Sequence, residues 1–275
     1  MNYNEIFYDT LRLTEHYKRK MSAQLNFKQE GEGSCILLIH GLFGTLDNLG
    51  LLARDLRQDH QIISVDLRNH GLSPQSDVHD YPSMAQDIAE LITTLDIDSL
   101  TVIGHSMGGK VAMQLASIIG ARIEKLVVMD MAPVAYTEAR HDAVFRALFA
   151  VIEAEPTSRA QAMEILNQGL TEPGVAQFLG KSLYNDQGVM RWRFNVPSLK
   201  ANYWHILGWH PLSPISAPTL FLKGANSPYI QSSYQGEIIA QFPNAKAHII
   251  ANTGHWLHAE KPAEVIRAIR KFIGD

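Results

Sequence analysis

Short apolar runs alternate with longer segments of helical periodicity along most of this chain. The runs are rich in Ile, Leu and Val, as expected for strands buried on both faces of a sheet. The predicted strands are Cys35–Ile39, Gln61–Val65, Leu100–Ile103, Lys125–Met129, Thr219–Leu222 and His248–Ile250. Strands separated by helices favour a mostly parallel central sheet flanked by helices on both sides. The pattern therefore predicts an α/β architecture.

Two of the predicted helices carry clear end signals. The first has one apolar face, formed by Met84, Ile88, Leu91 and Leu95. Ser83 is its predicted N-cap, and Gln86 three residues later completes a capping box. The last helix is predicted to open at Pro262, a favourable first-turn residue. Its buried face is predicted to hold Val265, Ile266, Ile269 and Phe272.

The alternation stops between residues 131 and 214. Helices are predicted there at Glu138–Ala154, Ser158–Gly169, Gly174–Tyr184 and Pro197–Leu207, with no strand between them. This block holds many of the aromatic residues: Phe145, Phe149, Phe178, Tyr184, Trp192, Phe194, Trp204 and Trp209. An insertion between two sheet strands would form a helical cap, whose aromatic side chains either line an apolar pocket or pack the cap onto the core.

The predicted organisation therefore has a core, a cap and an N-terminal part. Residues 1–33 are assigned to an N-terminal extension and first strand region, and residues 131–213 to the cap. The core consists of residues 34–130 and 214–275.

Composition excludes several classes of protein. The chain has 275 residues, of which 46% are hydrophobic, enough to bury a large core. Its net charge of −4 predicts no nucleic-acid or membrane partner. The single cysteine, Cys35, is expected to be a small buried hydrophobe. No segment approaches the roughly 20 apolar residues that span a bilayer, and no secretory signal is evident, so we expect a cytoplasmic protein.

A strand, a tight turn and a helix meet at Gly104-His105-Ser106-Met107-Gly108. Such a turn brings strand and helix close together, which favours glycine two residues before and two residues after its apex. The serine at the apex is then raised above the carboxyl edge of the sheet. Because both flanking elements are predicted, we interpret the pentapeptide as a nucleophile elbow with Ser106 as nucleophile, rather than as an ordinary glycine-rich loop.

A serine hydroxyl needs a general base within hydrogen-bond reach. His255 follows the last predicted strand, at the same sheet edge and after the serine in chain order, so it is the candidate base. The alternative is a histidine on a surface loop. His258 makes a His-x-x-His pair with His255, but no third ligand is evident nearby, so no metal site is predicted.

The acid that orients the base is predicted at the less common of two places. Many proteins of this kind carry it in a turn after the strand predicted here at Thr219–Leu222. This chain has Gly224-Ala225-Asn226-Ser227 there, without a carboxylate. Asp130 closes the buried strand after the elbow and would be costly there without a partner, so it is the candidate acid. The alternative roles for Asp130 are to cap a cap-segment helix or to pair with an arginine.

An oxyanion needs two N–H donors. The backbone N–H of Met107 follows the serine and is the first candidate. The second donor is expected from His40-Gly41-Leu42-Phe43-Gly44, with Leu42 preferred over Phe43; His40 is expected to hold this loop through backbone hydrogen bonds. The residues predicted to line the substrate pocket are Phe43, His105, Trp192, Tyr229 and Trp256.

These motifs carry a family resemblance. His40-Gly41, Asp66–Ser73, the elbow and Gly254-His255 occur in the order seen in α/β-hydrolases. Within that superfamily, four strings resemble those of the bacterial YbfF-type esterases: His40–Gly44, Arg68-Asn69-His70-Gly71, Met129–Pro133 and Asn226–Tyr229. The resemblance spans about Ser34 to Lys271. It implies an α/β-hydrolase fold with an inserted helical cap and a Ser106–Asp130–His255 triad.

The resemblance also implies hydrolysis of a small-molecule carboxylic ester or acyl thioester, without a cofactor. Haloalkane dehalogenases and epoxide hydrolases share the fold but place an aspartate at the elbow, and Ser106 argues against both. Carbon–carbon bond hydrolases and perhydrolases also use serine, so both stay open. A non-catalytic ligand-binding protein on the same fold is a further alternative. The motifs predict neither the natural substrate nor an oligomeric state.

Overall fold

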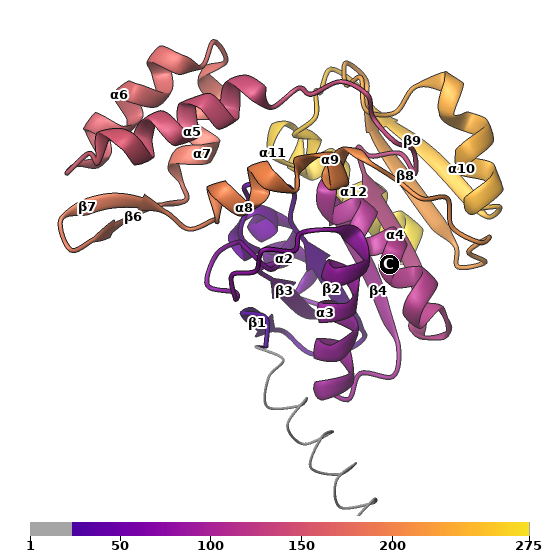
Figure 1. The fold of residues 1–275 in the computed structure, drawn as a ribbon. Coiled ribbons are helices and arrows are strands. Elements are labelled where there is room, and N and C mark those ends of the chain that lie inside the picture. The colour runs from indigo at the N-terminus through magenta and orange to yellow at the C-terminus, as the bar shows by residue number, and fades with distance from the viewer. Residues whose placement is uncertain (1–23, 275) are drawn as a thin grey trace, which may run out of the picture.

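A seven-stranded sheet forms the centre of the molecule in the computed structural model, which describes residues 24–274 (Figure 1). Its strand order is β1-β3-β2-β4-β5-β8-β9. The strands are β1 (Phe27–Glu30), β2 (Cys35–Ile39), β3 (Gln61–Val65), β4 (Leu100–His105), β5 (Ile123–Met129), β8 (Thr219–Gly224) and β9 (Ala245–Ile250). Only the edge pair β1–β3 is antiparallel among these. The predicted strands and α/β class are confirmed.

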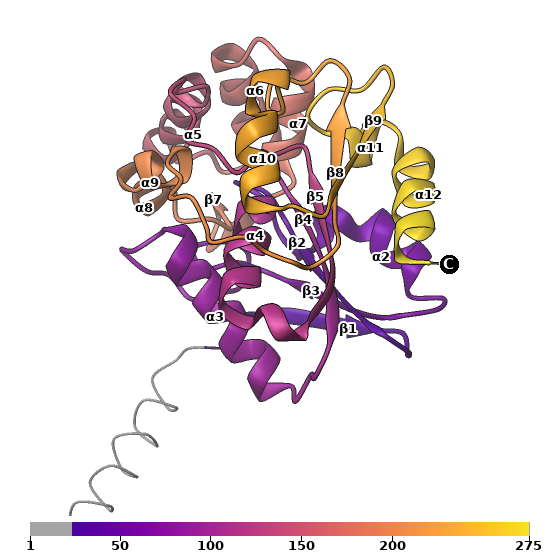
Figure 2. The ribbon, with the colours of Figure 1, turned by 90° about the vertical axis from the view of Figure 1, so that its right-hand side faces the viewer.

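Helices cover both faces of the sheet (Figure 2). One face packs against α2 (Gly50–Leu56), α11 (Leu257–Glu260) and α12 (Pro262–Ile273). The other packs against α3 (Tyr81–Thr94), α4 (Met107–Ile119) and α10 (Gln235–Gln241). Successive residues of a strand point to opposite faces, so Leu37 of β2 joins the α3–α4 side and Leu38 joins the α2–α12 side. Short 3-10 turns occupy Leu46–Leu49, Gly120–Arg122 and Ser232–Tyr234.

The ends of α3 and α12 test the predicted end signals. Helix α12 begins at Pro262 as predicted, with Val265 and Ile269 buried and Ile266 and Phe272 partly buried. The predicted N-cap of α3 was wrong. Asp80 is the N-cap, and its carboxylate accepts a hydrogen bond from the backbone N–H of Ser83 at 2.8 Å. A carboxylate caps at least as well as a hydroxyl, and the helix gains the turn that contains Pro82.

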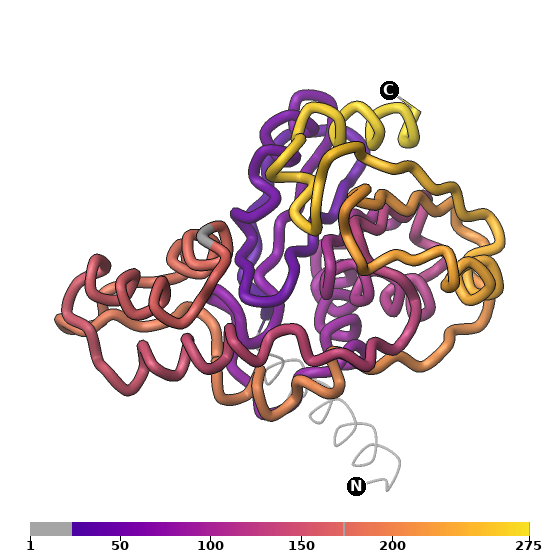
Figure 3. The backbone as a smooth tube through the Cα atoms, turned by 90° about the horizontal axis from the view of Figure 1, so that it is seen from above, coloured from indigo at the N-terminus to yellow at the C-terminus, as the bar shows by residue number. Residues whose placement is uncertain are grey.

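The cap segment, residues 131–213, lies between β5 and β8 in sequence and projects to one side of the sheet (Figure 3). Its helices are α5 (Asp142–Ala154), α6 (Arg159–Gly169), α7 (Pro173–Gly180), α8 (Val196–Ala201) and α9 (Tyr203–Leu207). It also contains a hairpin, β6 (Leu183–Asp186) and β7 (Val189–Trp192), where no strand was predicted. Gln187 and Gly188 both have positive φ, as a two-residue type I′ hairpin turn requires. Because β6 begins at Leu183, helix α7 ends at Gly180, whereas the sequence pattern predicted a helix as far as Tyr184.

The structure describes only residues 24–33 of the predicted N-terminal part. Residues 1–23 of the predicted N-terminal extension lie outside the described residues. Among residues 24–274, no helix combines the length and the apolar character needed to cross a bilayer.

Candidate active site

Ser106 lies at the apex of the turn between β4 and α4. Its backbone is strained, with φ 54° and ψ −122°, outside the regions that most residues adopt. A Cβ atom on Gly104 would lie 2.2 Å from the carbonyl oxygen of Gly108. A Cβ atom on Gly108 would lie 2.4 Å from the carbonyl oxygens of Ile39 and His40. Only glycine therefore lets β4, α4 and β2 approach closely enough to form this turn.

His255 lies in the loop after β9 and contacts Ser106. Its Nε2 is 2.8 Å from Ser106 Oγ, and its Nδ1 is 2.7 Å from Asp130 Oδ2. Because an ionised carboxylate can only accept, the proton belongs on Nδ1, and the Nε2 lone pair faces the serine hydroxyl. The three candidate residues, drawn from the ends of β4, β5 and β9, thus form one continuous hydrogen-bonded chain.

Asp130 follows β5 directly and is fully buried. Besides His255, its carboxylate accepts a 3.0 Å hydrogen bond from the backbone N–H of Gly224 and another from the hydroxyl of Ser227. The turn that contains Gly224 and Ser227 lacks a carboxylate. That turn supplies donors instead, which compensate for burial of the charge on Asp130. Ser227 is therefore a site residue that the sequence analysis did not assign.

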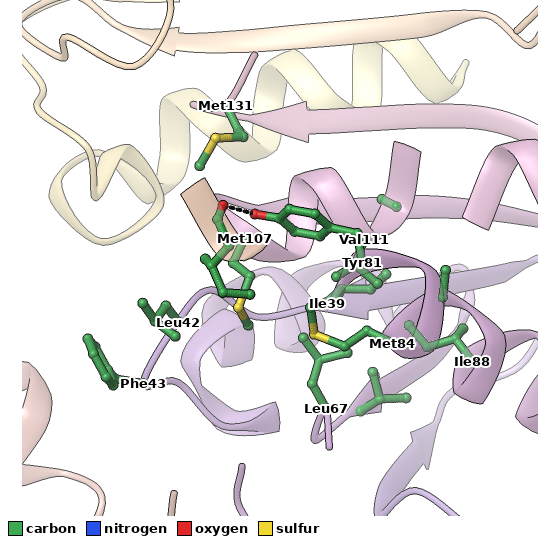
Figure 4. Close-up of a cluster of buried hydrophobic side chains, with 14 of the residues drawn as sticks. Ile39, Leu42, Phe43, Leu67, Tyr81, Met84, Ile88, Met107, Val111 and Met131 are labelled. Atoms are coloured by element: carbon green, nitrogen blue, oxygen red, sulfur yellow. Dashed lines mark hydrogen bonds between the residues drawn. The ribbon is translucent and has the colours of Figure 1, made fainter. Parts of the chain in front are cut away.

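The two candidate oxyanion donors are free to bind a ligand. Met107 is the first residue of α4, so its N–H has no partner inside the helix. In the described part of the chain, neither the N–H of Met107 nor that of Leu42 donates to another protein atom. The N–H of Phe43, the second choice, is occupied because it donates to His70 Nε2 at 3.2 Å. Leu42 and Met107 both belong to the buried cluster in Figure 4, and both line a cavity beside Ser106.

Two cavities of unequal size meet at Ser106. The larger, about 530 Å³, lies between the core and the cap segment, where Val144, Val175 and Phe178 form part of its wall. The smaller, about 30 Å³, is lined by Leu42, Met107, Met131 and tyrosine side chains. Arg140 and His141 of the cap segment line both, which the sequence analysis did not predict.

Four of the five predicted pocket residues line the larger cavity: Phe43, His105, Tyr229 and Trp256. The ring of Tyr229 also stacks on the ring of His255, with centroids 4.0 Å apart. The prediction for Trp192 was wrong, because this residue is not among those that line the cavity. Its indole lies inside the cap segment, stacked on Phe194 at 5.2 Å and donating to the carbonyl of Leu148.

Comparison with known proteins identifies the family. The model of the alpha/beta hydrolase family matches residues 36–268. The chain belongs to this family. It is 51% identical over 248 residues to esterase YbfF of Escherichia coli, covering 90% of this chain and 96% of that protein. It is 37% identical over 246 residues to the mouse sn-1-specific diacylglycerol lipase ABHD11, covering 86% and 80% of the two chains. The predicted resemblance to YbfF-type esterases is thus confirmed.

A solved structure agrees with this assignment. A marine microorganism esterase superposes with a TM-score of 0.88 at 34% identity, covering 91% of this chain and 99% of that one. The protein is therefore an α/β-hydrolase of the esterase and lipase type, with the fold that the motifs implied.

Two further histidines lie beside the candidate base His255 in this α/β-hydrolase. His105 is buried, and its Nε2 donates to the backbone carbonyl of His255 at 2.9 Å. Burial holds the pKa of His105 well below its usual range, and the nearby imidazoles of His258 and His255 lower it further. Burial likewise lowers the pKa of His258 to about 3. Both rings are neutral at pH 7; His105 supports the His255 loop through this hydrogen bond, and His258 packs against the ring of His105.

The His-x-x-His spacing is thus used for packing in this α/β-hydrolase. The ring of His258 lies 4.3 Å from that of His105, between centroids. In the part of the chain that the structure describes, no group of three His, Cys, Asp or Glu side chains is arranged to hold a metal ion.

Proposed function

We propose that this α/β-hydrolase cleaves carboxylic esters through an acyl-enzyme formed on Ser106. One observation carries the proposal: Ser106 Oγ is 2.8 Å from His255 Nε2, while Asp130 holds the opposite ring nitrogen at 2.7 Å. A serine with a base oriented by a third group is the arrangement that activates a hydroxyl for nucleophilic attack. The names of the relatives, esterase and lipase, support the same reaction class.

The proposed reaction has two halves. His255 takes the Ser106 proton as the hydroxyl attacks the acyl carbon, and the N–H groups of Leu42 and Met107 stabilise the tetrahedral oxyanion. His255 then protonates the leaving alcohol or thiol. Water, deprotonated by the same histidine, attacks the acyl-enzyme and releases the acid. Asp130 stays ionised and stabilises the imidazolium in both halves.

The cavities favour a substrate with one large apolar group. The wall of the larger cavity is mainly apolar and has room for a chain of several carbons, whereas the smaller admits only a smaller group. The leaving group can be an alcohol or a thiol, since His255 can protonate either. A series of p-nitrophenyl esters and acyl-CoA thioesters of increasing chain length, compared by kcat/KM, would distinguish the two classes. Cytoplasmic location and independence of a cofactor stay predictions from the sequence.

Changing Ser106 to alanine tests the proposed nucleophile. Removal of the hydroxyl should lower kcat for a p-nitrophenyl ester by about 10⁴ or more, because no acyl-enzyme can form. A fluorophosphonate probe should label the wild-type protein and leave the Ser106→Ala protein unlabelled, with circular dichroism as the folding control.

The same assay addresses the alternatives. Labelling without ester turnover would favour a carbon–carbon bond hydrolase or a perhydrolase. Absence of both labelling and turnover would favour a ligand-binding protein. Retention of ester turnover by Ser106→Ala would eliminate the serine mechanism.

A further inference from the structure

Residues Gly41–Gly44 form the turn that carries the proposed donor Leu42. The N–H of Gly44 donates to the carbonyl of Gly41 at 3.0 Å, which makes Leu42 and Phe43 the central residues of a β-turn. Phe43 has φ 63°, as the third residue of a type II turn requires, although that position usually holds glycine or asparagine. A phenylalanine there is strained by about 1–3 kcal/mol, so surrounding contacts must hold the turn.

His70 supplies a directional contact to this turn. It lies in the loop after β3, is 1% exposed, and accepts the N–H of Phe43 on its Nε2. Its Nδ1 lies 3.0 Å from the carbonyl of Arg68, which can only accept. The ring must therefore carry its proton on Nδ1 and keep Nε2 as an acceptor. Burial, followed by the nearby imidazoles of His40 and His79, keeps the pKa of His70 well below its usual range, so the acceptor persists at neutral pH.

His40 makes the reciprocal contact between the same two loops. It precedes the turn, and its Nε2 accepts the backbone N–H of Leu67, in the loop of His70, at 3.1 Å. Its Nδ1 lies 2.7 Å from the carbonyl of Gly41. The two imidazole centroids are 5.0 Å apart. Each loop therefore donates one backbone N–H to a histidine of the other, which fixes their relative position.

The loop of His70 is also attached to the cap segment. Asn69 accepts the N–H of Asn195 on its carbonyl at 2.9 Å, and its side chain donates to Ser198 Oγ at 3.3 Å. His70 forms a β-bridge with Phe194, whose ring lies 5.3 Å from that of Phe43. The turn, the loop of His70 and the junction between β7 and α8 thus form one packed unit beside the catalytic chain.

We propose that His70 is a positioning residue of the reaction: its Nε2 holds the Gly41–Gly44 turn in the conformation that presents the Leu42 N–H to the oxyanion. His70 does not line either cavity and so acts through the turn rather than on the substrate. This inference rests on the proposed function. It assigns a chemical task to His70 within the string Arg68-Asn69-His70-Gly71.

Two substitutions test the contacts of the two ring nitrogens of His70 one at a time. In His70→Gln the side-chain oxygen can replace Nε2 and accept the Phe43 N–H. In His70→Asn the shorter amide can replace only the Nδ1 contact to Arg68. We expect His70→Asn to lower kcat for a p-nitrophenyl ester by on the order of 10², approaching the loss of an oxyanion donor, with little change in KM. His70→Gln should keep kcat within several-fold of wild type.

A trifluoromethyl ketone provides a readout that a general packing defect would not reproduce. Ser106 adds to its carbonyl and creates an oxyanion, so its Ki should rise in His70→Asn in proportion to the loss of kcat, while binding of the free carboxylic acid product stays unchanged. His79→Gln is the matched control, because His79 is buried in the same loop but does not contact the turn; it should affect stability only.

The possible outcomes separate this inference from the proposed function. If the wild-type protein neither turns over esters nor reacts with fluorophosphonate, the proposed function fails and the role of His70 falls with it. If the wild type is active but the two His70 variants lose the same activity, or neither loses any, only the role of His70 is overturned. Should His70→Asn not fold, ¹⁵N spectra of the histidine side chains decide. The signals of His70 are those present in the wild type and absent from His70→Gln. We expect them to show a ring protonated on Nδ1, and a ring protonated on Nε2 would overturn the inference.

Discussion

Asp130 at the end of β5 supplies the carboxylate that contacts His255, although the turn after β8 has none. The backbone of Asp130 has φ 54°, and its N–H donates to the carbonyl of Leu222 on the neighbouring strand at 2.7 Å. Its buried charge is stabilised by donors from the β8 turn. The carboxylate therefore lies at the end of β5, and its hydrogen-bond donors lie at the end of the adjacent strand β8.

Asparagine at position 130 should lower kcat by about 10³ to 10⁴, because an amide favours the wrong tautomer of His255. Ser227→Ala should cost less, about 10- to 100-fold, the value of one hydrogen bond to a charged group. Asn226→Ala is the matched control from the same turn, since its side chain is exposed, and it should remain near wild type. All three are compared in one esterase assay; a folded Asp130→Asn enzyme with normal kcat would place the acid elsewhere.

Much of the site could be predicted at this scale. Ser106 and His255 lie beside glycines at strand ends, and Asp130 closes an apolar run, so local sequence marks all three. The donors from Gly224 and Ser227 were not predictable, because only the pairing of β5 with β8 brings them to Asp130. Trp192 was wrongly placed for a similar reason: its orientation depends on the unpredicted hairpin in the cap segment.

Among the helices and strands, the turn around Ser106 depends on the close approach of β4, α4 and β2 to one another. The apolar runs predicted the strands because β2 and β4 are buried along their whole length and β5 is buried from Leu126 to Met129. The cap segment was predicted less well, since short elements packed mainly on one another carry weak periodicity. The turn at Gln187-Gly188 lies between the helices predicted at Gly174–Tyr184 and Pro197–Leu207, and its positive φ angles depend on the pairing of β6 with β7.

Replacing Gly108 and Gly120 with alanine should change the free energy of unfolding in opposite directions. At Gly108 the new Cβ would meet backbone oxygens of β2, which cannot move aside as a side chain can, so we expect destabilisation of at least about 1–3 kcal/mol. At Gly120, the C-cap in helical conformation with nothing within 4 Å, alanine should stabilise by about 0.4–1 kcal/mol. Urea unfolding measures both. Equal effects at the two positions would contradict the close approach inferred for the elbow.

In the molecule as a whole, the buried side chain of Lys110 joins α4 of the core to the end of the cap segment at Gly208. Lys110 of α4 has no exposed surface, and its Nζ donates to the carbonyl of Gly208 at 3.0 Å. The rings of Tyr81, Tyr136 and Trp209 surround it at 4.7 to 5.5 Å from their centroids. Burial lowers the pKa of Lys110 from 10.5 to about 7.

This burial should make stability depend on pH. Between the folded pKa near 7 and the unfolded value of 10.5, the unfolded chain binds a proton that the folded protein does not, so stability rises with pH in that window and is lowest below it. From pH 7 to 9 the rise should be on the order of 2 kcal/mol. This rise in stability should be absent from Lys110→Met and retained in Lys246→Met, which replaces an exposed lysine. Urea unfolding at several pH values tests this, and equal slopes in all three proteins would refute it.

The unequal cavities at Ser106 also make the site a handed environment. An ester of a secondary alcohol carries a large group, a small group and hydrogen on one carbon, and only one enantiomer can direct the two groups into the about 530 Å³ and about 30 Å³ spaces while its ester carbonyl meets the Leu42 and Met107 amides. Misplacing even one methyl group costs about 1–3 kcal/mol in a transition state. The protein should therefore resolve such racemates with an enantiomeric ratio of about 10 or more, measurable by chiral chromatography of the released alcohol; equal rates for both enantiomers would mean that the narrow space is not used.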